Sequence, residues 1–201
     1  MSERALDQDA LAVIDVIRAS VRISGVTQRD FAGAVGTSPS RLSAYIHGET
    51  APSAALMLRC QRIGEALGAA RAESVPTSLD AAASVRTALA AQGRSSGVLR
   101  MVLEGRDRLR DTLQHRPHLA DAWAARALVG DERWDTLLAA LVEHEFEATG
   151  RPAPAWTRTE PLDEEWLPAP GRLGVEAVRR QTPPWLAEKR ILLAESALQV
   201  A

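Results

Sequence analysis

The chain is poor in several kinds of residue, and each scarcity excludes a class of protein. Its 201 residues include a single cysteine, Cys60, which rules out an internal disulfide and a cysteine-based metal site. No apolar run reaches the roughly 18 residues that a membrane-spanning helix needs. The first residues, Met1 to Asp7, lack the basic and apolar regions of a secretory signal peptide. We therefore expect a cytoplasmic protein without contact to a membrane.

Excess positive charge is also absent. The net charge of −2 at pH 7 argues against a nonspecific coat on nucleic acid, so any basic surface must be local. Of the 24 lysine and arginine residues only Lys189 is lysine, and together with the abundant alanine this indicates a high-GC bacterial genome. Contacts to phosphate or guanine would therefore be made almost wholly by arginine, whose planar guanidinium group suits both.

Signs of catalysis are scarce as well. His115 and His118 have an i,i+3 spacing and His144 lies between two glutamates, but no third ligand accompanies them. The sequence contains neither a glycine-rich phosphate loop nor a nucleophile elbow. The position of Cys60 on the apolar face of a predicted helix favours a buried core thiol. We expect no enzyme activity, no catalytic residues, no metal and no cofactor.

What the sequence does contain, in residues 23–48, is a pattern of two short helices joined by a tight turn. Thr27 can cap the first helix, and Gly36 supplies the backbone freedom to leave it. Ser38 can cap the second helix, and Pro39 occupies its first position, where the missing N–H costs little. Apolar residues at helical spacing would hold both helices in a bundle: Phe31, Ala32, Val35, Leu42, Tyr45 and Ile46.

This segment resembles the Cro/C1-type helix-turn-helix of the XRE family of transcriptional regulators. The resemblance covers about residues 9–68 and is carried by Thr27-Gln28, Gly36-Thr37-Ser38, Leu42-Ser43, Tyr45, His47-Gly48 and Pro52-Ser53. In that family the second helix lies in the major groove of double-stranded DNA, and the first helix crosses the backbone. The resemblance implies a sequence-specific DNA-binding regulator, found with the bacterial nucleoid when it is bound to DNA.

The resemblance also identifies candidate DNA-contacting residues. Arg41 is the first candidate for base recognition, because a bidentate arginine–guanine contact is the commonest specific one; its alternative is a contact to phosphate alone. Ser40 and Ser43 would read bases or bond to their own helix, and Thr27 would contact phosphate, cap its helix, or do both. The full set is Thr27, Gln28, Thr37, Ser38, Pro39, Ser40, Arg41, Ser43, Ala44 and His47.

Helical periodicity and breaks predict an all-α chain of two domains. Residues 1–70 form the helix-turn-helix DNA-binding domain, and 71–77, with Pro76, form a linker. Residues 78–201 form a helical domain for dimerisation, effector binding or partner binding. In it we expect a helix capped by Ser78, a second ending near Gln114, and a third from Asp131 to about Thr149. The arginine-rich stretch 94–116 would flank DNA or form a solvated helix face.

The segment 151–171 differs in composition, with five prolines that forbid a long helix and two tryptophans that need burial. We expect an extended strap on the helical core. The strap itself is acidic, with Glu160, Asp163, Glu164 and Glu165, so Trp156 and Trp166 would anchor a basic partner protein or simply belong to the core.

The resulting hypothesis is an autoregulating repressor that binds a palindromic operator as a homodimer. Three stretches faintly resemble XRE-type regulators that act as antitoxins of nucleotidyltransferase-type toxins: 134–141, Pro154-Ala155-Trp156 and 184–191. The first alternative is therefore a toxin protein as partner. The second alternative is a regulator that responds to a small molecule held between helices. The third is a scaffold whose helix-turn-helix no longer binds DNA.

Overall fold

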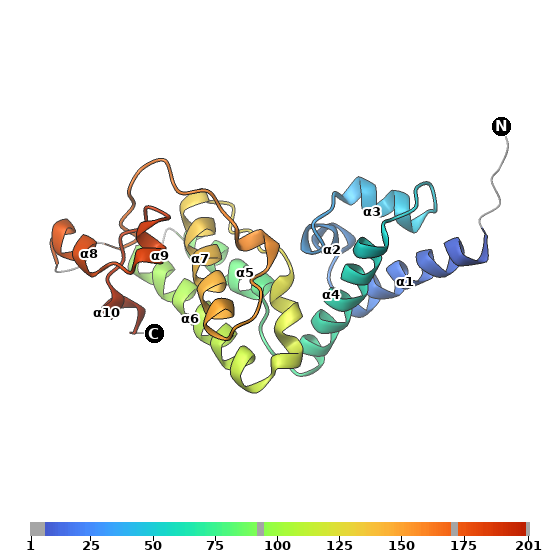
Figure 1. The fold of residues 1–201 in the computed structure, drawn as a ribbon, viewed down its shortest axis with the longest axis horizontal. Helices are drawn as coiled ribbons and strands as arrows, with labels where there is room; N and C mark the ends of the chain where they lie inside the picture. The colour runs from blue at the N-terminus through green and yellow to red at the C-terminus, as the bar shows by residue number, and fades with distance from the viewer. Residues whose placement is uncertain (1–6, 92–94, 170–172, 200–201) are drawn as a thin grey trace. The chain divides into compact units, whose positions relative to one another are not determined.

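The computed structural model describes residues 7–91, 95–169 and 173–199, and their regular structure is helical (Figure 1). Within these ranges the one pairing of β type is an isolated parallel bridge between Trp166 and Ile191. The predicted all-α class is therefore confirmed. The chain divides into two compact units: unit 1 comprises Met1–Val75 and His118–Arg126, and unit 2 comprises Pro76–Pro117 and Ala127–Ala201.

Unit 1 contains α1 (Gln8–Ser24), α2 (Gln28–Ala34), α3 (Pro39–Ile46), α4 (Ala54–Ala72) and nearly all of the 3-10 helix η1 (Pro117–Ala124). Each α-helix follows a polar residue whose side chain accepts a hydrogen bond from the N–H three positions on: Asp7, Thr27, Ser38 and Ser53. The predicted caps Thr27 and Ser38 are thus confirmed. Glycines with positive φ end the first three helices: Gly25, Gly36 and Gly48.

α1 and α4 lie side by side and in close contact (Figure 1). A Cβ atom on Gly64 would lie 2.7 Å from the carbonyl oxygen of Ser20, and one on Gly68 would lie 2.7 Å from that of Ile23. The two glycines in the middle of α4 therefore allow the backbones to approach. The buried side chains of this core include Ile14, Ile17, Phe31, Leu42, Cys60, Ile63 and Leu67, and burial raises the pKa of the Cys60 thiol to about 11.

The segment His118–Arg126 belongs to unit 1, although the chain reaches it only after passing through part of unit 2. Asp121 forms an ion pair with Arg62 of α4, and His118 Nε2 lies 3.0 Å from a carboxylate oxygen of Glu73. The apolar side chains of the segment, Leu119, Ala120, Ala122, Trp123 and Ala125, are buried. The linker predicted at 71–77 includes Val75, the last residue before the chain enters unit 2. The sequence-based division had placed the returning segment in the second domain, 78–201.

Unit 2 contains α5 (Ser78–Ala90), α6 (Ser95–His115) and α7 (Glu132–Ala148), followed by the short helices η2 (Ala155–Thr157), α8 (Val175–Gln181), α9 (Pro184–Ala187) and α10 (Glu195–Leu198). The cap of α5 is Thr77, one residue before the predicted Ser78, because Thr77 and Asp80 hydrogen-bond each other. Asp131 caps α7 as predicted. The predicted break at Gly93 and part of the arginine-rich stretch, Arg94, lie outside the described residues.

The proline-rich segment after α7 lies along unit 2, with η2 against α7 (Figure 1). Trp166 packs edge-to-face on Trp134 of α7, with ring centroids 4.8 Å apart and planes at 86°. The main-chain N–H of Trp166 donates to the carbonyl oxygen of Arg190 at 2.9 Å, and its main-chain carbonyl oxygen accepts from Leu192 N–H at 2.8 Å. The segment from Arg151 to Ala169 is thereby tied to the C-terminal residues 189–192. The last two residues of the predicted strap, 170–171, lie outside the described residues.

Candidate nucleic-acid interface

The helix-turn-helix of unit 1 presents the start of α3 to solvent. Ser38 Oγ accepts the N–H of Arg41 at 3.2 Å and lies 3.0 Å from Ser40 Oγ, which fixes the first turn of the helix. Leu42 is fully buried and anchors α3 to the bundle, while Pro39, Ser40 and Arg41 are exposed. The residues expected to meet base edges in the first turn are therefore accessible on a fixed helix.

The second turn of α3 is less accessible. Ser43 and Ala44 are half-buried. His47, the C-cap residue, turns back on its own helix, with Nδ1 2.8 Å from the carbonyl oxygen of Ser43 and 3.3 Å from its Oγ. Ser43 and His47 thus already have local partners, so of the predicted base-reading set Ser40 and Arg41 carry the polar groups best exposed for DNA.

At the start of α2, the two predicted phosphate contacts differ. The Thr27 hydroxyl donates to the Asp30 carboxylate at 2.6 Å, and its oxygen accepts the Asp30 N–H at 3.1 Å. Its capping role is therefore filled, and the nearby carboxylate is unfavourable for a phosphate. Gln28 is exposed at the first helical position, where free N–H groups and the helix dipole favour an anion.

Thr37 lies in the turn between α2 and α3 and is half-buried. Its N–H donates to the carbonyl oxygen of Ala32 at 2.9 Å, which closes the end of α2. The main-chain group is thus used by the turn itself. Any contact of Thr37 with a phosphate must come from its side chain.

Three arginines of unit 1 donate to carbonyl oxygens at helix ends. Arg18 donates to Ile46 at the end of α3 at 2.8 Å, and Arg59 donates to Val35 at the end of α2 at 3.1 Å. Arg71 does the same for Gly25 at the end of α1, at 3.4 Å. A cation at a helix C-terminus is favourable because the last carbonyl groups are unpaired and carry partial negative charge. These arginines primarily stabilise the bundle.

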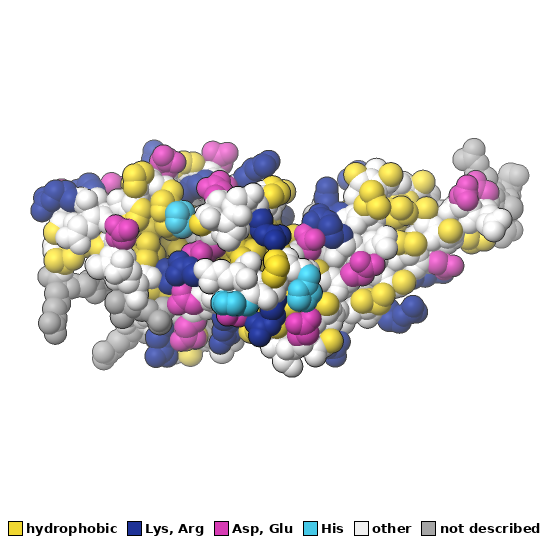
Figure 2. Space-filling view, turned by 60° about the horizontal axis from the view of Figure 1, so that its bottom comes forward, with side chains coloured by type: hydrophobic (Ala, Val, Ile, Leu, Met, Phe, Trp, Pro, Cys, Tyr) yellow, Lys and Arg dark blue, Asp and Glu magenta, His cyan; other side chains and the backbone are white. Residues whose placement is uncertain are grey.

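The remaining arginines of unit 1 are the candidates for DNA. Arg62 is paired with Asp121. Within the described part of the chain, the side chains of four arginines of this unit make no hydrogen bond or ion pair: Arg22, Arg29, Arg41 and Arg126. Arg29 and Arg41 belong to the helix-turn-helix, whereas Arg126 comes from the returning segment. On the face shown in Figure 2, basic and acidic side chains are interspersed over both units.

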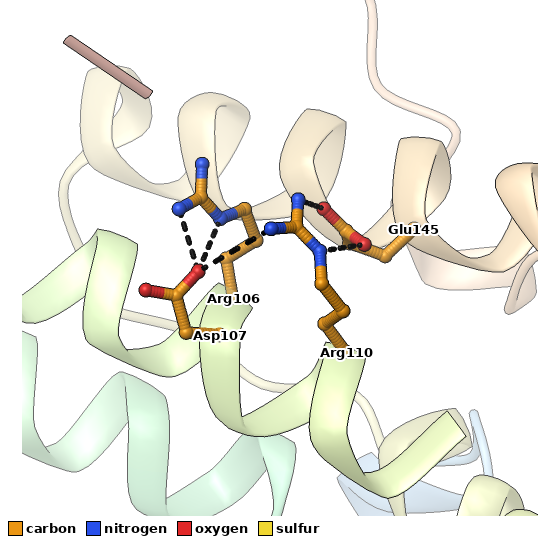
Figure 3. A network of polar contacts seen from close by, with 4 residues as sticks. All are labelled: Arg106, Asp107, Arg110 and Glu145. Carbon is orange, nitrogen blue, oxygen red and sulfur yellow. Dashed lines mark hydrogen bonds and ion pairs between the residues drawn. The ribbon is translucent and has the colours of Figure 1, made fainter. Parts of the chain in front are cut away.

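The arginines of helix α6 in unit 2 are exposed, except Arg106. Arg110 forms a bidentate pair with Glu145 of α7, at 2.6 and 3.0 Å, and this hydrogen-bonded carboxylate raises the pKa of the arginine (Figure 3). Arg106 is only 4% exposed and donates to Asp107 at 2.6 and 2.9 Å. Arg110 therefore joins α6 to α7, whereas Arg106 pairs with its neighbour on α6. The sequence pattern of mixed charge did not indicate the contact of Arg110 with α7.

The predicted partner residues lie in unit 2, and both are half-buried. Trp166 and Trp134 are in edge-to-face contact. Trp156 belongs to η2, which contacts α7. Beyond them, Glu165 pairs with Arg179, and the hydrogen bond from Arg179 holds the pKa of the Glu165 carboxyl below its ordinary value. The tryptophans thus take part in the packing of unit 2 and keep part of their surface exposed.

The histidines considered as ligands have separate partners: His115 lies 3.0 Å from an Asp111 carboxylate oxygen, and His144 stacks on Trp185 at 4.3 Å. Across the ranges that the structure describes, no group of three or more His, Cys, Asp or Glu side chains could hold a metal ion. Among these same residues, every helix is too short or too polar to cross a lipid bilayer.

Comparison with known proteins gives one result. Residues 20–63, which include α2, the turn and α3, match the helix-turn-helix family model. No curated protein and no solved structure is significantly similar to the chain. The match falls on the segment in which the capped, exposed start of α3 was found. The first unit therefore carries a helix-turn-helix of the Cro/C1 type, the DNA-binding domain of XRE-family regulators.

Proposed function

We propose that this chain is a repressor of its own promoter that binds a palindromic operator as a homodimer. The observation that carries the proposal is the start of α3, where Ser40 and Arg41 are exposed beside the cap Ser38. Arg41 has no polar partner for its side chain within the described residues, so its guanidinium group is available for the N7 and O6 atoms of guanine. Repression then requires only an operator that overlaps the promoter.

The dimer follows from the size of the reading surface. One short helix reads only a few base pairs, and family members gain selectivity by placing two such helices about 34–36 Å apart, one turn of DNA. A two-fold dimer of this kind matches a palindromic operator. We assign the dimer contacts to unit 2, which leaves the helix-turn-helix of each copy free for DNA. Such a protein works in the cytoplasm, on the nucleoid.

A gel shift on the DNA upstream of its own gene tests this function. Purified protein is titrated against that fragment and against an unrelated duplex of equal length, at several salt concentrations. We expect a shift of the upstream fragment that persists at higher salt and in excess competitor, because base contacts do not depend on counterion release. Equal binding to both duplexes would contradict sequence-specific recognition. Sedimentation of the free protein at the same concentrations checks the dimer, and a monomer would contradict it.

One observation favours a second role for unit 2, the binding of a basic partner protein. The carboxylates of Glu160, Asp163 and Glu164 are exposed along the strap, and they make no ion pair with the residues that the structure describes. Half-buried Trp156 lies on the same segment. We propose that this acidic edge neutralises a toxin enzyme, as an antitoxin does. Co-expression with the product of the adjacent gene, followed by co-purification and a growth assay, tests this role, and growth arrest that the chain does not relieve would contradict it.

No catalytic or cofactor-dependent activity is included in the proposal. Repression and partner neutralisation both require binding alone.

A further inference from the structure

We propose that Arg126 extends the DNA-binding surface of unit 1 by contacting the phosphate backbone beside the helix-turn-helix. This inference rests on the proposed DNA-binding function. It adds to the helix-turn-helix a residue that lies outside residues 20–63, the segment that matches the family. Three observations support it: the anchoring of the returning segment, the position of Arg126 at the end of α2, and the charge balance of unit 1.

The returning segment His118–Arg126 is fixed to unit 1 at both ends and in the middle. His118 lies 3.0 Å from Glu73, and Asp121 pairs with Arg62. Leu119 and Ala125 are fully buried. A segment held by polar contacts and buried side chains presents its remaining exposed residue, Arg126, from a defined place.

That place is the end of α2, just before the turn that leads to α3. The main-chain N–H of Arg126 faces the carbonyl oxygen of Ala34 at 3.4 Å. Arg59 donates to the next carbonyl oxygen, that of Val35, at 3.1 Å. Two arginines are therefore anchored at the turn that precedes the exposed start of α3. Arg59 uses part of its guanidinium group for the anchoring, whereas Arg126 uses only its main chain.

The charge balance of unit 1 supports a role for Arg126 at DNA. The described part of unit 1 holds as many acidic residues as arginines. The acidic residues are Asp7, Asp9, Asp15, Asp30, Glu49, Glu65, Glu73 and Asp121. The arginines are Arg18, Arg22, Arg29, Arg41, Arg59, Arg62, Arg71 and Arg126. A neutral unit gains no general attraction for DNA, so phosphates must be met by arginines that have no acidic partner. Asp121, the acidic residue of the same segment, is already paired with Arg62. The positive charge of Arg126 is thus uncompensated there.

The experiment compares Arg126→Ala and Arg126→Lys with the full-length wild type. Fluorescence anisotropy measures binding to a mixed-sequence duplex of about 30 base pairs as the salt rises from about 50 to 200 mM. The alanine variant keeps the N–H that faces Ala34, so we expect it to fold, and a thermal melt verifies this. Arg180→Ala is the control, because it removes one positive charge from an exposed residue of unit 2.

Loss of one phosphate contact reduces the steepness of log affinity against log salt by about 0.9. When the salt rises over this range, the affinity of the wild type should therefore fall by a factor about 3-fold to 4-fold larger than that of Arg126→Ala. We expect Arg126→Lys to keep the wild-type slope and Arg180→Ala to leave it unchanged. An unchanged slope in Arg126→Ala, or an equal change in Arg180→Ala, would overturn the inference and leave the proposed function intact. Failure of the wild type to bind any duplex would overturn both.

Discussion

Several arginines of the two units have different kinds of partner. In unit 1, arginines donate to carbonyl oxygens at helix ends, as Arg59 does, or keep a side chain without a polar partner among the described residues, as Arg41 does. In unit 2, Arg110 and Arg179 are held by the carboxylates Glu145 and Glu165. A guanidinium group that donates to a neutral carbonyl keeps its net positive charge, whereas one paired with a carboxylate does not. Arg41 and Arg59 thus keep their positive charge without a carboxylate partner in the unit that carries the helix-turn-helix.

The cores differ as well. Unit 1 brings two helices together through glycines, and unit 2 packs aromatic rings, with Trp166 against Trp134 and His144 against Trp185. We therefore expect core substitutions to change stability and to leave DNA binding by the folded protein unchanged. A substitution on the exposed face of the helix-turn-helix should change DNA binding and leave stability unchanged. The following predictions test this separation.

The largest effect is expected from Trp166→Ala. The substitution removes a half-buried ring, its edge-to-face contact with Trp134 and the packing of the strap, at a cost of about 3 kcal/mol. Chemical denaturation followed by tryptophan fluorescence and circular dichroism measures the loss. Affinity for DNA should stay unchanged at temperatures where the variant is folded. A variant as stable as the wild type would show that the strap does not stabilise unit 2.

Next comes Gly64→Ala, with Gly33→Ala as its matched control. A Cβ atom at Gly64 would lie 2.7 Å from the main chain of Ser20, so α1 and α4 must move apart, at a cost of about 2 kcal/mol. Gly33 of α2 has no atom within 4 Å of such a Cβ, so alanine there gains helix propensity of up to about 1 kcal/mol. Thermal unfolding should shift in opposite directions, and shifts of the same sign would refute the close-packing argument.

Arg41→Ala tests the function of unit 1. We expect the preference for the upstream fragment over unrelated DNA to fall by about 1–3 kcal/mol, the discrimination of one bidentate arginine–base contact. Since Arg41 is exposed, the melting temperature should not change. Competition gel shifts measure the preference. If Arg41→Ala kept the preference and lowered only the salt dependence, Arg41 would contact phosphate alone, the alternative stated from the sequence.

The smallest effect concerns the exposed pair of Glu165 and Arg179. The arginine lowers the pKa of Glu165 in the folded state, so the pair stabilises the protein above the ordinary glutamate pKa of about 4.3. This contribution is lost as the pH falls through the lowered value. The melting temperature of the wild type should exceed that of Glu165→Gln slightly at neutral pH, and the difference should vanish in acid. A difference independent of pH would contradict an electrostatic origin.

The local features of the candidate site were predictable from the sequence because they depend on neighbouring residues. Thr27 and Ser38 cap helices that begin one residue later, and Gly36 leaves α2 with a positive φ, which glycine tolerates best. The prediction of Ser78 as a cap was wrong by one residue, since the main-chain N–H and the hydroxyl of Thr77 both donate to the Asp80 carboxylate. Such errors are small because the signals act within a single turn.

Features that join distant residues needed the structure. Nothing in the pattern of residues 118–126 indicates that Asp121 pairs with Arg62 or that Arg126 meets the end of α2. In the same way, mixed charge on α6 gave no sign that Arg110 faces Glu145 of α7 (Figure 3).

The sequence alone therefore determined the all-α class and the helix-turn-helix with its caps. These follow from hydrogen bonds and periodicity over a few residues. The sequence also supplied the candidates for base reading, namely Pro39, Ser40, Arg41, Ser43 and Ala44. The tertiary structure decided which arginines keep an uncompensated charge and that a later segment completes unit 1. Both depend on the packing of segments far apart in the chain, which no local pattern encodes.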